Sequence, residues 1–531
     1  MNISIIQAAS RVGDLQHNFK VIKEKYDEAL AAGDDICLFP ELMTTGYLAK
    51  DLFFKESFIN DLNEQLDLII KHTKKTFLLL PTALMEGGKL YNAVIAAADG
   101  VIIGRTYKKS LPNFGIFDER RYFSSGNPQI IEINNVKIGV PICRDIWSPE
   151  VCKTLQKQDA KLFIVVNGSP FEKDKKLTTR IALVTERFNE TSIPLIYCNQ
   201  ALAQDGIIFD GKSFIYDGKT QIICKAFAED TARVIYAGNK LSCNANINSN
   251  TTFEADIYQA IMLATKDYVK QNGFNSVIIG LSGGIDSALV CVLAVDCFGA
   301  ENVHAVMMPT KYTSSESIED AWDLAKSLGI RLQEINIDHL VNLYHESLNL
   351  DTDSIDIAAQ NLQSRIRGTI LMTIANEQGK LLLSTGNKSE SATGYATLYG
   401  DMCGAFSPIG DLYKTEIYKV VNYLNNKQEA DIIPANIINK APSAELKPNQ
   451  KDSDDLGDYN VLDQILQLYI EQDLSKEEII NNHNFNEEIV SKIIRLVKKS
   501  EFKRQQAAPV ARLTKKDFKN SRRYPITNGY P

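Results

Sequence analysis

One short stretch of the chain, VIIGLSGGIDSALV, limits the folds that its second half can adopt. An apolar run that begins at Val277 is interrupted by Ser282, Gly283 and Gly284, and a second apolar run follows at once. Two adjacent glycines let the backbone turn sharply and bring its N–H groups close to a ligand. The stretch therefore predicts a strand, a tight turn and a helix N-terminus, which is a common arrangement for binding anions.

The segments around this stretch alternate between strand and helix spacing, and glycines close several of the helices. Strands are expected at 276–281, 303–309, 331–337 and 380–387, and helices at 253–272, 285–298, 315–328 and 361–379. A β-α-β-α-β order of this kind predicts a doubly wound parallel sheet, which is a Rossmann-like α/β fold.

The first half mixes hairpins with strand–helix units. Asp-Gly pairs at Asp99, Asp210 and Asp217 predict hairpin turns between apolar runs. Apolar runs are expected to form strands at 3–8, 35–39, 76–83, 92–107, 130–143, 162–166, 194–199 and 207–220, with a helix at 18–32. The pattern predicts an α/β sandwich over residues 1–241. A polar segment, 242–252, is rich in Asn and Ser and is expected to link it to a second domain over 253–531.

Charge and cysteine usage exclude several classes of protein. The formal net charge is −8, so bulk attraction to nucleic acid or to an anionic membrane is not expected. No apolar run reaches the roughly 18 residues of a membrane span, and the first residues do not resemble a signal peptide. The nine cysteines lack paired spacing, and the six histidines lack metal-site spacing. These features predict free thiols, a cytoplasmic protein and no zinc site.

The glycine-rich loop differs from the common nucleotide motifs. It fits neither GxxxxGK[ST] nor GxGxxG, and it lacks the phosphate-binding lysine. Ser282 and Ser287 offer hydroxyl groups, and Asp286 offers a carboxylate of the kind that holds Mg²⁺ against phosphates. The string SGGIDS resembles the pyrophosphate loop of the ATP pyrophosphatases, which cleave ATP between its α and β phosphates. The resemblance implies ATP binding by Gly280, Leu281, Ser282, Gly283, Gly284, Ile285, Asp286 and Ser287.

Further strings in the second half, AAQNLQSRIRG at 358–368 and STGNKSESATGYATLYGDMCG from Ser384, are similar to signatures of the NAD synthetases. The resemblance implies that Thr385, Lys414 and Ser443 contact ATP. It also implies that Glu390 joins Asp286 on Mg²⁺, and that Asn361, Glu390 and Lys503 bind deamido-NAD⁺. Eight basic residues and one acid follow from 503 onward, and this segment is expected to close over the anionic dinucleotide.

A different chemistry is indicated in the first half, where Cys143 ends an apolar run and is followed at once by charged residues. A thiol needs activation before it can attack a carbonyl group, and no histidine is nearby in the sequence. Glu41 and Lys108 follow other predicted strands and could supply a general base and a charge that stabilises an oxyanion. Such a set could support attack of the thiol on a carbonyl group.

The set Glu41, Lys108 and Cys143 resembles the catalytic triad of the nitrilase superfamily, whose fold is an α-β-β-α sandwich. The family spacing Lys-x-x-Leu-Pro-Asn selects Lys108 over Lys109. The resemblance implies that Glu119 orients the site and that Phe114, Ser169 and Lys175 bind glutamine. The chain departs from the family pattern at Arg144, where Glu is frequent, at Phe114, where Tyr is usual, and at Leu202-Ala203.

Together the two halves resemble the glutamine-dependent NAD⁺ synthetases, which are ATP-dependent carbon–nitrogen ligases. The resemblance implies that ammonia from glutamine amidates adenylated deamido-NAD⁺, giving NAD⁺, AMP and pyrophosphate, and that the chain forms at least a homodimer. Two alternatives remain at this point. One is an adenylating amidotransferase that acts on another carboxylate or on a tRNA base, and the other is a nucleotide sensor without turnover.

Overall fold

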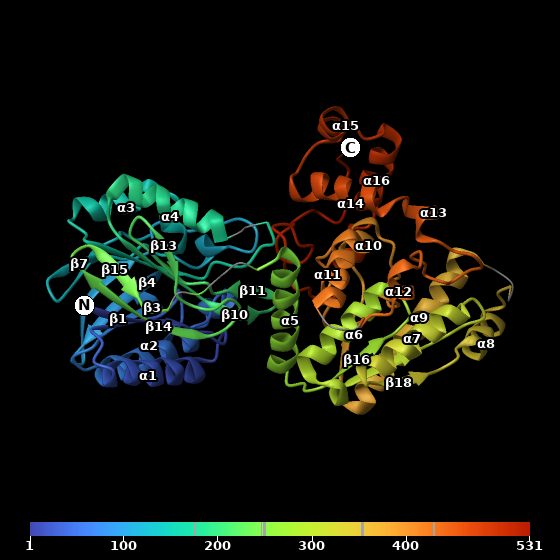
Figure 1. Cartoon of the computed structure of the whole chain (residues 1–531), viewed down its shortest axis with the longest axis horizontal. Coiled ribbons are helices and arrows are strands. Elements are labelled where there is room, and N and C mark those ends of the chain that lie inside the picture. Colours follow the sequence, from blue (N-terminus) through green and yellow to red (C-terminus); the bar gives the residue numbers. More distant parts are fainter. Residues whose placement is uncertain (175–176, 246, 248–250, 352–354, 428–430, 531) are drawn as a thin grey trace. The chain divides into compact units, whose positions relative to one another are not determined.

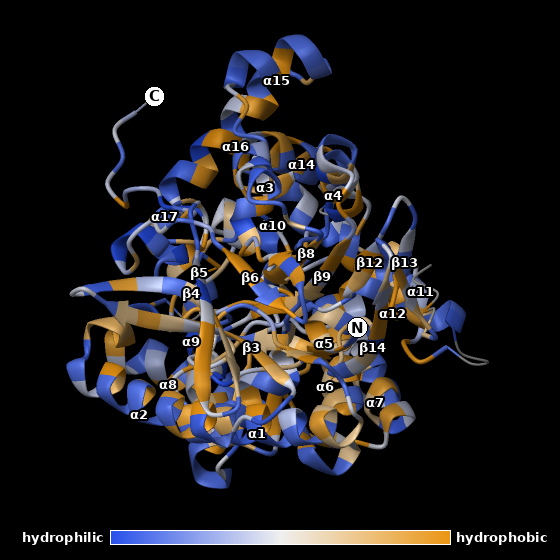
Figure 2. Cartoon of the chain, turned by 90° about the vertical axis from the view of Figure 1, so that its left-hand side faces the viewer, coloured by the Kyte–Doolittle hydropathy of each residue, from blue (hydrophilic) through white to orange (hydrophobic). Residues whose placement is uncertain are grey.

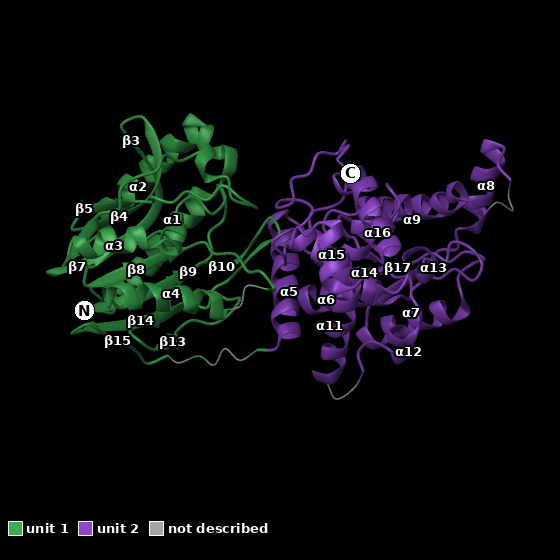
Figure 3. Ribbon diagram, turned by 90° about the horizontal axis from the view of Figure 1, so that it is seen from above, with its two compact units in different colours: residues 1–251 green, residues 252–531 purple. Residues whose placement is uncertain are grey.

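The computed structural model describes the chain except for residues 175–176, 246, 248–250, 352–354, 428–430 and 531. The chain divides into two compact units, Met1–Thr251 and Thr252–Pro531 (Figure 3). The segment predicted to be a linker, 242–252, begins inside strand β15 (Lys240–Cys243). It ends at Thr252, whose side chain caps helix α5 (Phe253–Gln271) by accepting a hydrogen bond from the backbone N–H of Ala255.

Two sheets form the centre of the first unit. One has the strand order β15-β14-β1-β2-β3-β4-β5 and the other β13-β12-β9-β8-β7-β6, with a separate hairpin, β10-β11. Their strands are β1 (Asn2–Gln7), β2 (Ile36–Leu38), β3 (Phe77–Glu86), β4 (Lys89–Ala98), β5 (Val101–Tyr107), β6 (Ile130–Ile133), β7 (Val136–Gly139), β8 (Leu162–Asn167), β9 (Leu195–Asn199), β10 (Ala201–Gln204), β11 (Ile207–Asp210), β12 (Phe214–Tyr216), β13 (Thr220–Ile222) and β14 (Asp230–Ala237).

Burial follows the two-residue period of the strands, which places apolar side chains on both faces of each sheet. Ile3 and Ile5 of β1 pack between the sheets, whereas Ile6 faces helices α1 (Leu15–Ala31) and α2 (Glu56–His72). Helices α3 (Pro149–Lys157) and α4 (Leu177–Thr191) cover the other sheet (Figure 1). Every residue of β8 and β9 is buried, and Figure 2 colours both strands as mostly hydrophobic. The predicted α-β-β-α sandwich is confirmed.

Two of the three predicted Asp-Gly hairpins are present. Asp99 joins β4 to β5, and Asp217 joins β12 to β13. The prediction at Asp210 is wrong, because β11 pairs with β10 and not with β12. The adjacent Gly211 instead gives room to a buried side chain. A Cβ atom at this position would lie 2.2 Å from the Gln7 amide, which accepts a hydrogen bond from the backbone N–H of Ser213.

The second unit has a four-stranded sheet of order β18-β17-β16-β19, in which all neighbours are parallel. Its strands are β16 (Val277–Gly280), β17 (Val303–Met307), β18 (Arg331–Glu334) and β19 (Leu381–Leu383). Its connecting helices include α6 (Ile285–Phe298), α7 (Ser315–Leu328), α8 (Asp338–Leu348) and α9 (Ile357–Gln378). The predicted doubly wound parallel sheet is confirmed, although α8 was not expected and α9 begins four residues before the predicted start.

The remaining helices of the second unit follow the sheet in the chain. They are α10 (Lys388–Thr393), α11 (Lys414–Lys427), α12 (Ala435–Asn439), α13 (Asp452–Leu456), α14 (Tyr459–Leu466), α15 (Lys476–His483), α16 (Glu487–Lys499) and α17 (Glu501–Arg504). Basic residues of the last segment serve packing, since the buried side chains of Arg504 and Arg522 both pair with Glu501. No helix in the described part of the chain is long and apolar enough to cross a membrane.

Candidate active sites

The structure brings the predicted catalytic residues of the first unit together in a buried cluster. Glu41 follows β2, Lys108 directly follows β5, and Cys143 opens the short helix η3 (Cys143–Trp147). The Lys108 ammonium donates hydrogen bonds to Glu41 Oε1 at 2.6 Å and to Glu119 Oε1 at 2.7 Å. All four side chains are at least nine-tenths buried. A cation is thus held between two carboxylates beside a thiol.

Neighbouring groups fix both oxygens of Glu41. Asn92 Nδ2 donates to Oε1 at 2.8 Å, and the backbone N–H of Gly168 donates to Oε2 at 2.9 Å. A side chain at Gly168 is excluded, because a Cβ there would lie 2.9 Å from the Tyr47 ring. The Tyr47 hydroxyl in turn donates to Glu119 Oε1 at 2.9 Å. Sequence reasoning did not identify Asn92, Tyr47 or Gly168, since their contacts to the cluster span 51 to 127 residues.

Burial and charge determine the protonation of the cluster. Burial raises the pKa of the Cys143 thiol, and the negative charge of Glu41 raises it further, although Lys108 opposes this. The thiol is therefore protonated at rest and needs a base. Burial alone would lower the pKa of Lys108, but Glu119 and Glu41 raise it, so the ammonium stays charged. Burial raises the pKa of Glu119 to about 7 despite Lys108.

A tight turn presents the thiol. Cys143 has a φ of 46°, a left-handed conformation that is rare outside glycine and frequent at functional turns. The Asp145 carboxylate holds this turn by accepting hydrogen bonds from the backbone N–H groups of Ile142 at 3.2 Å and Ser110 at 2.7 Å. Asp145 thereby ties the nucleophile turn to the segment that follows Lys108. Sequence reasoning did not identify Asp145, although a carboxylate two residues after the cysteine was a signal that could have indicated it.

The predicted glutamine-binding residues lie in different surroundings. Ser169 is buried, and its backbone N–H donates to Asn199 Oδ1 at 3.0 Å. Phe114 is 52% exposed, and the Arg144 guanidinium lies 5.1 Å from the centre of its ring. Lys175 lies outside the described residues. Leu202 and Ala203, which depart from the family pattern, belong to β10 of the separate hairpin.

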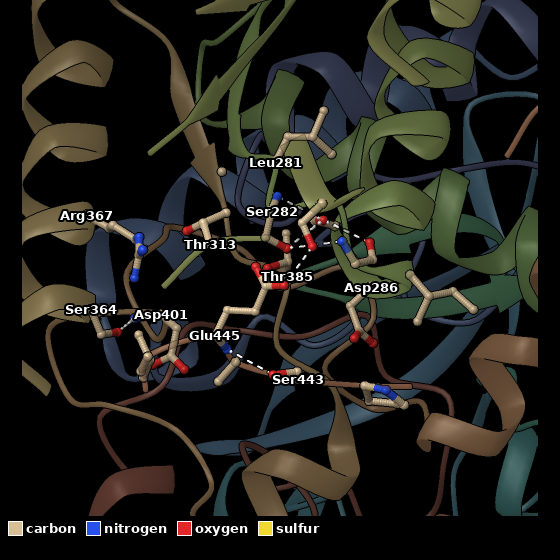
Figure 4. Close-up of a pocket in the computed structure, with 18 of the residues that line it drawn as sticks. Leu281, Ser282, Asp286, Thr313, Ser364, Arg367, Thr385, Asp401, Ser443 and Glu445 are labelled. Carbon is tan, nitrogen blue, oxygen red and sulfur yellow. Dashed lines mark hydrogen bonds between the residues drawn. The ribbon is translucent and has the colours of Figure 1, made fainter. Parts of the chain in front are cut away.

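The glycine-rich loop of the second unit borders a cavity of about 560 Å³ (Figure 4). Ser282 Oγ lies 3.2 Å from Ser287 Oγ and accepts a hydrogen bond from the backbone N–H of Gly284 at 3.3 Å. Gly283 has a φ of 79°, and a Cβ there would lie 2.2 Å from the Ser317 carbonyl oxygen. The loop therefore packs against the first turn of α7, so the N-termini of α6 and α7 both meet the cavity.

Most of the residues predicted for ATP and Mg²⁺ line this cavity. They are Gly280, Leu281, Ser282, Gly284, Ile285, Asp286, Ser287, Thr385, Glu390, Lys414 and Ser443. Gly283, Asn361 and Lys503 are not among its lining residues. Ser443 stands on a loop whose Glu445 accepts hydrogen bonds from the hydroxyls of Ser317 on α7 and of Ser314, the residue that caps this helix. The loop that carries Ser443 is thus attached beside the glycine-rich turn.

Two carboxylates and a lysine meet at one end of the cavity. Lys414 Nζ pairs with Asp286 Oδ2, and Asn387 Nδ2 donates to Asp286 Oδ1 at 3.1 Å. Burial raises the pKa of Glu390 well above its ordinary value, and the charge of Asp286 adds to this effect. The two carboxylates thus repel each other, and a cation bound between them would relieve this repulsion. This donor set suits a hard cation that also binds phosphate oxygens.

Asp452 is a third carboxylate near this end and was not identified from the sequence. It is 5% exposed and lines the cavity, and it accepts a hydrogen bond from the Tyr459 hydroxyl at 3.1 Å. Its other oxygen, Oδ1, is buried without a hydrogen-bond partner. Burial raises its pKa, with Lys414 opposing the shift. The sequence signal was weak, because Asp452 belongs to an acidic run typical of an exposed helix start.

The residues predicted for deamido-NAD⁺ surround one loop beside the cavity. Thr397 Oγ1 donates to Asn361 Oδ1 at 2.8 Å, and the backbone N–H of Thr397 donates to Asp401 Oδ1 at 2.6 Å. From the other side, Lys503 Nζ donates to the carbonyl oxygens of Gly394 at 2.8 Å and Ala396 at 2.7 Å. Asp401 lines the cavity, as Figure 4 shows, and burial raises its pKa to about 6.

Comparisons with known proteins agree with this division of the chain. Family models for carbon-nitrogen hydrolase and NAD synthase match residues 2–242 and 257–507. The chain is 40% identical to the glutamine-dependent NAD(+) synthetase of Acinetobacter baylyi, over 99% of this chain and 98% of that protein. It is 37% identical to the enzyme of that name from Thermotoga maritima, over 100% of this chain and 99% of that protein.

A solved structure is also similar to this chain over its whole length. Glutamine-dependent NAD⁺ synthetase from Acinetobacter baumannii, in complex with ADP, superposes with a TM-score of 0.79 at 37% identity. The alignment covers 100% of this chain and 99% of that one. The likeness extends over both units and is not confined to one of them.

Proposed function

The chain belongs to the glutamine-dependent NAD⁺ synthetases, and we propose that it releases ammonia from glutamine in its first unit and uses it in its second unit to amidate deamido-NAD⁺. ATP is the second substrate and yields AMP and pyrophosphate. The observation that carries this proposal is the buried cluster of Glu41, Lys108 and Cys143 in one unit, together with the serine- and glycine-lined cavity in the other.

The first reaction is an amide hydrolysis through a thioester. Glu41 accepts the thiol proton as Cys143 attacks the amide carbon of glutamine, and Lys108 stabilises the tetrahedral oxyanion. The proton on Glu41 passes to the leaving nitrogen, and ammonia departs. Water then attacks the thioester, with Glu41 again as base, and glutamate is released. Glu119 keeps Lys108 oriented, while Phe114, Ser169 and Lys175 hold the substrate.

The second reaction joins the ammonia to an activated carboxylate. The nicotinate carboxylate of deamido-NAD⁺ attacks the α-phosphate of ATP and expels pyrophosphate, which the backbone N–H groups and hydroxyls of residues 282–287 receive at the N-terminus of α6. Thr385, Lys414 and Ser443 contact ATP. The dinucleotide is positioned by the loop that is surrounded by Asn361, Glu390 and Lys503. Ammonia then displaces AMP from the acyl adenylate.

Asp286 and Glu390 would hold Mg²⁺, and the mutual repulsion of these two neighbouring carboxylates supports this assignment. Bound there, the ion would neutralise charge on the phosphates. Lys414 would turn from Asp286 to the ATP phosphates when the ion is bound, because a lysine and a divalent cation compete for the same oxygens. We further propose a homodimer in the cytosol, with no nucleic-acid or membrane partner.

Replacing Cys143 with Ala tests the division of labour. Synthesis of NAD⁺ with glutamine should fall to background, whereas synthesis with added ammonium chloride should continue at the wild-type rate. The assay follows NAD⁺ and pyrophosphate with each nitrogen source in turn. Loss of both activities in a variant that keeps its folded circular-dichroism spectrum would contradict two separate sites.

A further inference from the structure

The cavity of the second unit is lined by an arginine, Arg367, as well as by lysines. Arg367 lies on α9 and is only partly exposed to solvent. Its Nε donates to the carbonyl oxygen of Met308 at 3.0 Å, directly after β17. Figure 4 shows the side chain extending from α9 toward the middle of the cavity. One neutral contact thus fixes the base of the guanidinium, and its terminal N–H groups are left for a ligand.

No ion pair neutralises the charge of Arg367. Among the described residues, no carboxylate pairs with its guanidinium, whereas Lys414 in the same cavity pairs with Asp286. Three carboxylates act on it only from further away, namely those of Glu445, Asp338 and Asp401. Burial lowers the pKa of Arg367 to about 10, because water is largely excluded from the guanidinium. A buried cation without a paired anion favours the binding of an anionic group.

Arg367 stands where two regions of the second unit meet. Near the start of α9, Asn361 Oδ1 contacts the loop of the predicted deamido-NAD⁺ site. About one turn later, Ser364 Oγ accepts a hydrogen bond from the backbone N–H of Asp401 at 3.0 Å. Arg367 follows after a further turn and contacts Met308 at the carboxyl end of β17. The face of α9 that bears these residues therefore runs from the dinucleotide loop to the nucleotide cavity.

The glycine-rich loop separates Arg367 from the other end of the cavity. Figure 4 shows Ser282 between Arg367 and Asp286, with Asp401 on the same side as Arg367. Pyrophosphate that leaves onto residues 282–287 occupies the N-terminus of α6, where Asp286 lies in the first turn. The α-phosphate is bonded to this pyrophosphate and extends from it toward the dinucleotide loop. That direction leads to the guanidinium of Arg367.

We propose that Arg367 contacts the α-phosphate of ATP while the carboxylate of the dinucleotide attacks it. The inference rests on the proposed adenylation. In this step a carboxylate oxygen forms a bond to the α-phosphorus, and the bond from that phosphorus to the bridging oxygen breaks. Pyrophosphate leaves with the electron pair, and no proton is transferred. Negative charge gathers on the non-bridging oxygens of the α-phosphate, to which a guanidinium presents paired N–H donors.

The test compares the two products of the step. In Arg367→Gln, pyrophosphate release from ATP and deamido-NAD⁺, measured without a nitrogen source, should fall about a hundredfold. The affinity for AMP, measured by calorimetry, should fall about tenfold, the scale of a lost hydrogen bond to a charged group. The affinity for pyrophosphate should not change, which also shows that the cavity is folded. Arg367→Lys should retain part of the AMP affinity, because it keeps the charge without the planar donors.

Arg331→Gln is the matched control, since it removes an exposed arginine of β18 that is not among the lining residues of the cavity. Its kinetics should match the wild type. In Arg367→Gln, an equal loss of affinity for AMP and pyrophosphate would show a general effect on the cavity and overturn the inference. An unchanged rate of pyrophosphate release would overturn it as well.

Weaker binding of deamido-NAD⁺ by Arg367→Gln, with unchanged AMP affinity, would assign Arg367 to the dinucleotide and also overturn the inference. The proposed function has a separate outcome. If the wild-type chain released no pyrophosphate from ATP and deamido-NAD⁺, the proposed adenylation itself would be wrong.

Discussion

At the scale of single residues, Glu119 links the buried cluster to pH. Its pKa is raised to about 7, so it loses its proton near neutrality. The carboxylate form of Glu119 is the one that pairs with the Lys108 ammonium, whose Nζ donates to Glu119 Oε1 at 2.7 Å. The folded chain holds the proton of the Glu119 carboxyl more tightly than the unfolded chain does. Glu119 therefore lowers the free energy of unfolding as pH rises from 4.5 to about 7.

The corresponding prediction concerns the pH profile of glutamine hydrolysis. Log kcat/KM should rise as pH increases through about 7, because the ionised Glu119 pairs with Lys108 and holds its ammonium in place to stabilise the oxyanion. In Glu119→Gln this ascending limb should disappear and the rate should be lower. The profile is measured by glutamate release, with ammonium-driven synthesis followed in parallel. A limb that persists unchanged in the variant would assign it to another group.

Gly283 supports a second prediction at this scale. In Gly283→Ala the new Cβ would collide with the Ser317 carbonyl oxygen at 2.2 Å, and the residue would be strained at a φ of 79°. The loop must shift away from α7, so pyrophosphate release should fall at least tenfold with either nitrogen source, while glutamine hydrolysis is retained. Gly329→Ala is the control, because it has a φ of 63° but nothing within 4 Å of the new atom. Equal losses in the two variants would indicate backbone strain alone.

At the scale of elements, local signals decided which predictions were correct. The bounds of α6 and α7 agree with the sequence because Gly299 and Gly329 close them and an apolar period fills them. Helix α8 gave no such signal, and four of its apolar residues are exposed, namely Leu340, Leu343, Tyr344 and Leu348. The turn at Asp210 was mispredicted because a local Asp-Gly signal cannot show that Gly211 makes room for the distant Gln7.

The same distinction applies to the sites. Glu41, Lys108 and Cys143 each stand after an apolar strand, so their sequence positions mark them. Asp452 has no such mark, since its importance depends on burial against Tyr459 and on the charges of distant elements. Sequence patterns therefore identify site residues that directly follow a strand. They miss site residues that only tertiary packing places beside the others.

Helix α10 supports a prediction about how the second site is held. Lys388 at its start is fully buried and donates to Glu471 at 2.9 Å and to Thr514 Oγ1 at 2.7 Å, and it pairs with Asp411 at 2.8 Å. Lys388→Met would leave two carboxylates buried without their cation, at a cost of about 3–5 kcal/mol.

The Lys388→Met variant should unfold at lower temperature and lose synthesis with ammonium, since α10 also carries Glu390. Lys419→Met removes an exposed lysine of α11 and is the control. Differential scanning calorimetry and the ammonium assay measure the two effects. A melting temperature equal to that of the control would show that the buried ion pairs contribute little.

At the scale of the whole molecule, the chain contains two compact units, and each contains one of the two candidate active sites. The cluster around Cys143 uses residues 41–168 of the first unit, and the cavity at Ser282 uses residues 280–452 of the second. The two sites share no residue. A substitution that removes one reaction should therefore leave the chemistry of the other intact.

Asp286→Ala tests this separation from the side opposite to Cys143→Ala. The change removes the carboxylate that pairs with Lys414 and, with Glu390, forms the proposed Mg²⁺ site. Synthesis from glutamine and from ammonium should fall by about a hundredfold or more, the scale of losing a group that stabilises developing charge. Glutamate release from glutamine should persist, because no residue of that cluster is altered. Normal synthesis in the variant would refute the metal role of Asp286. Loss of glutamate release together with synthesis would mean that the first site depends on the second for its activity.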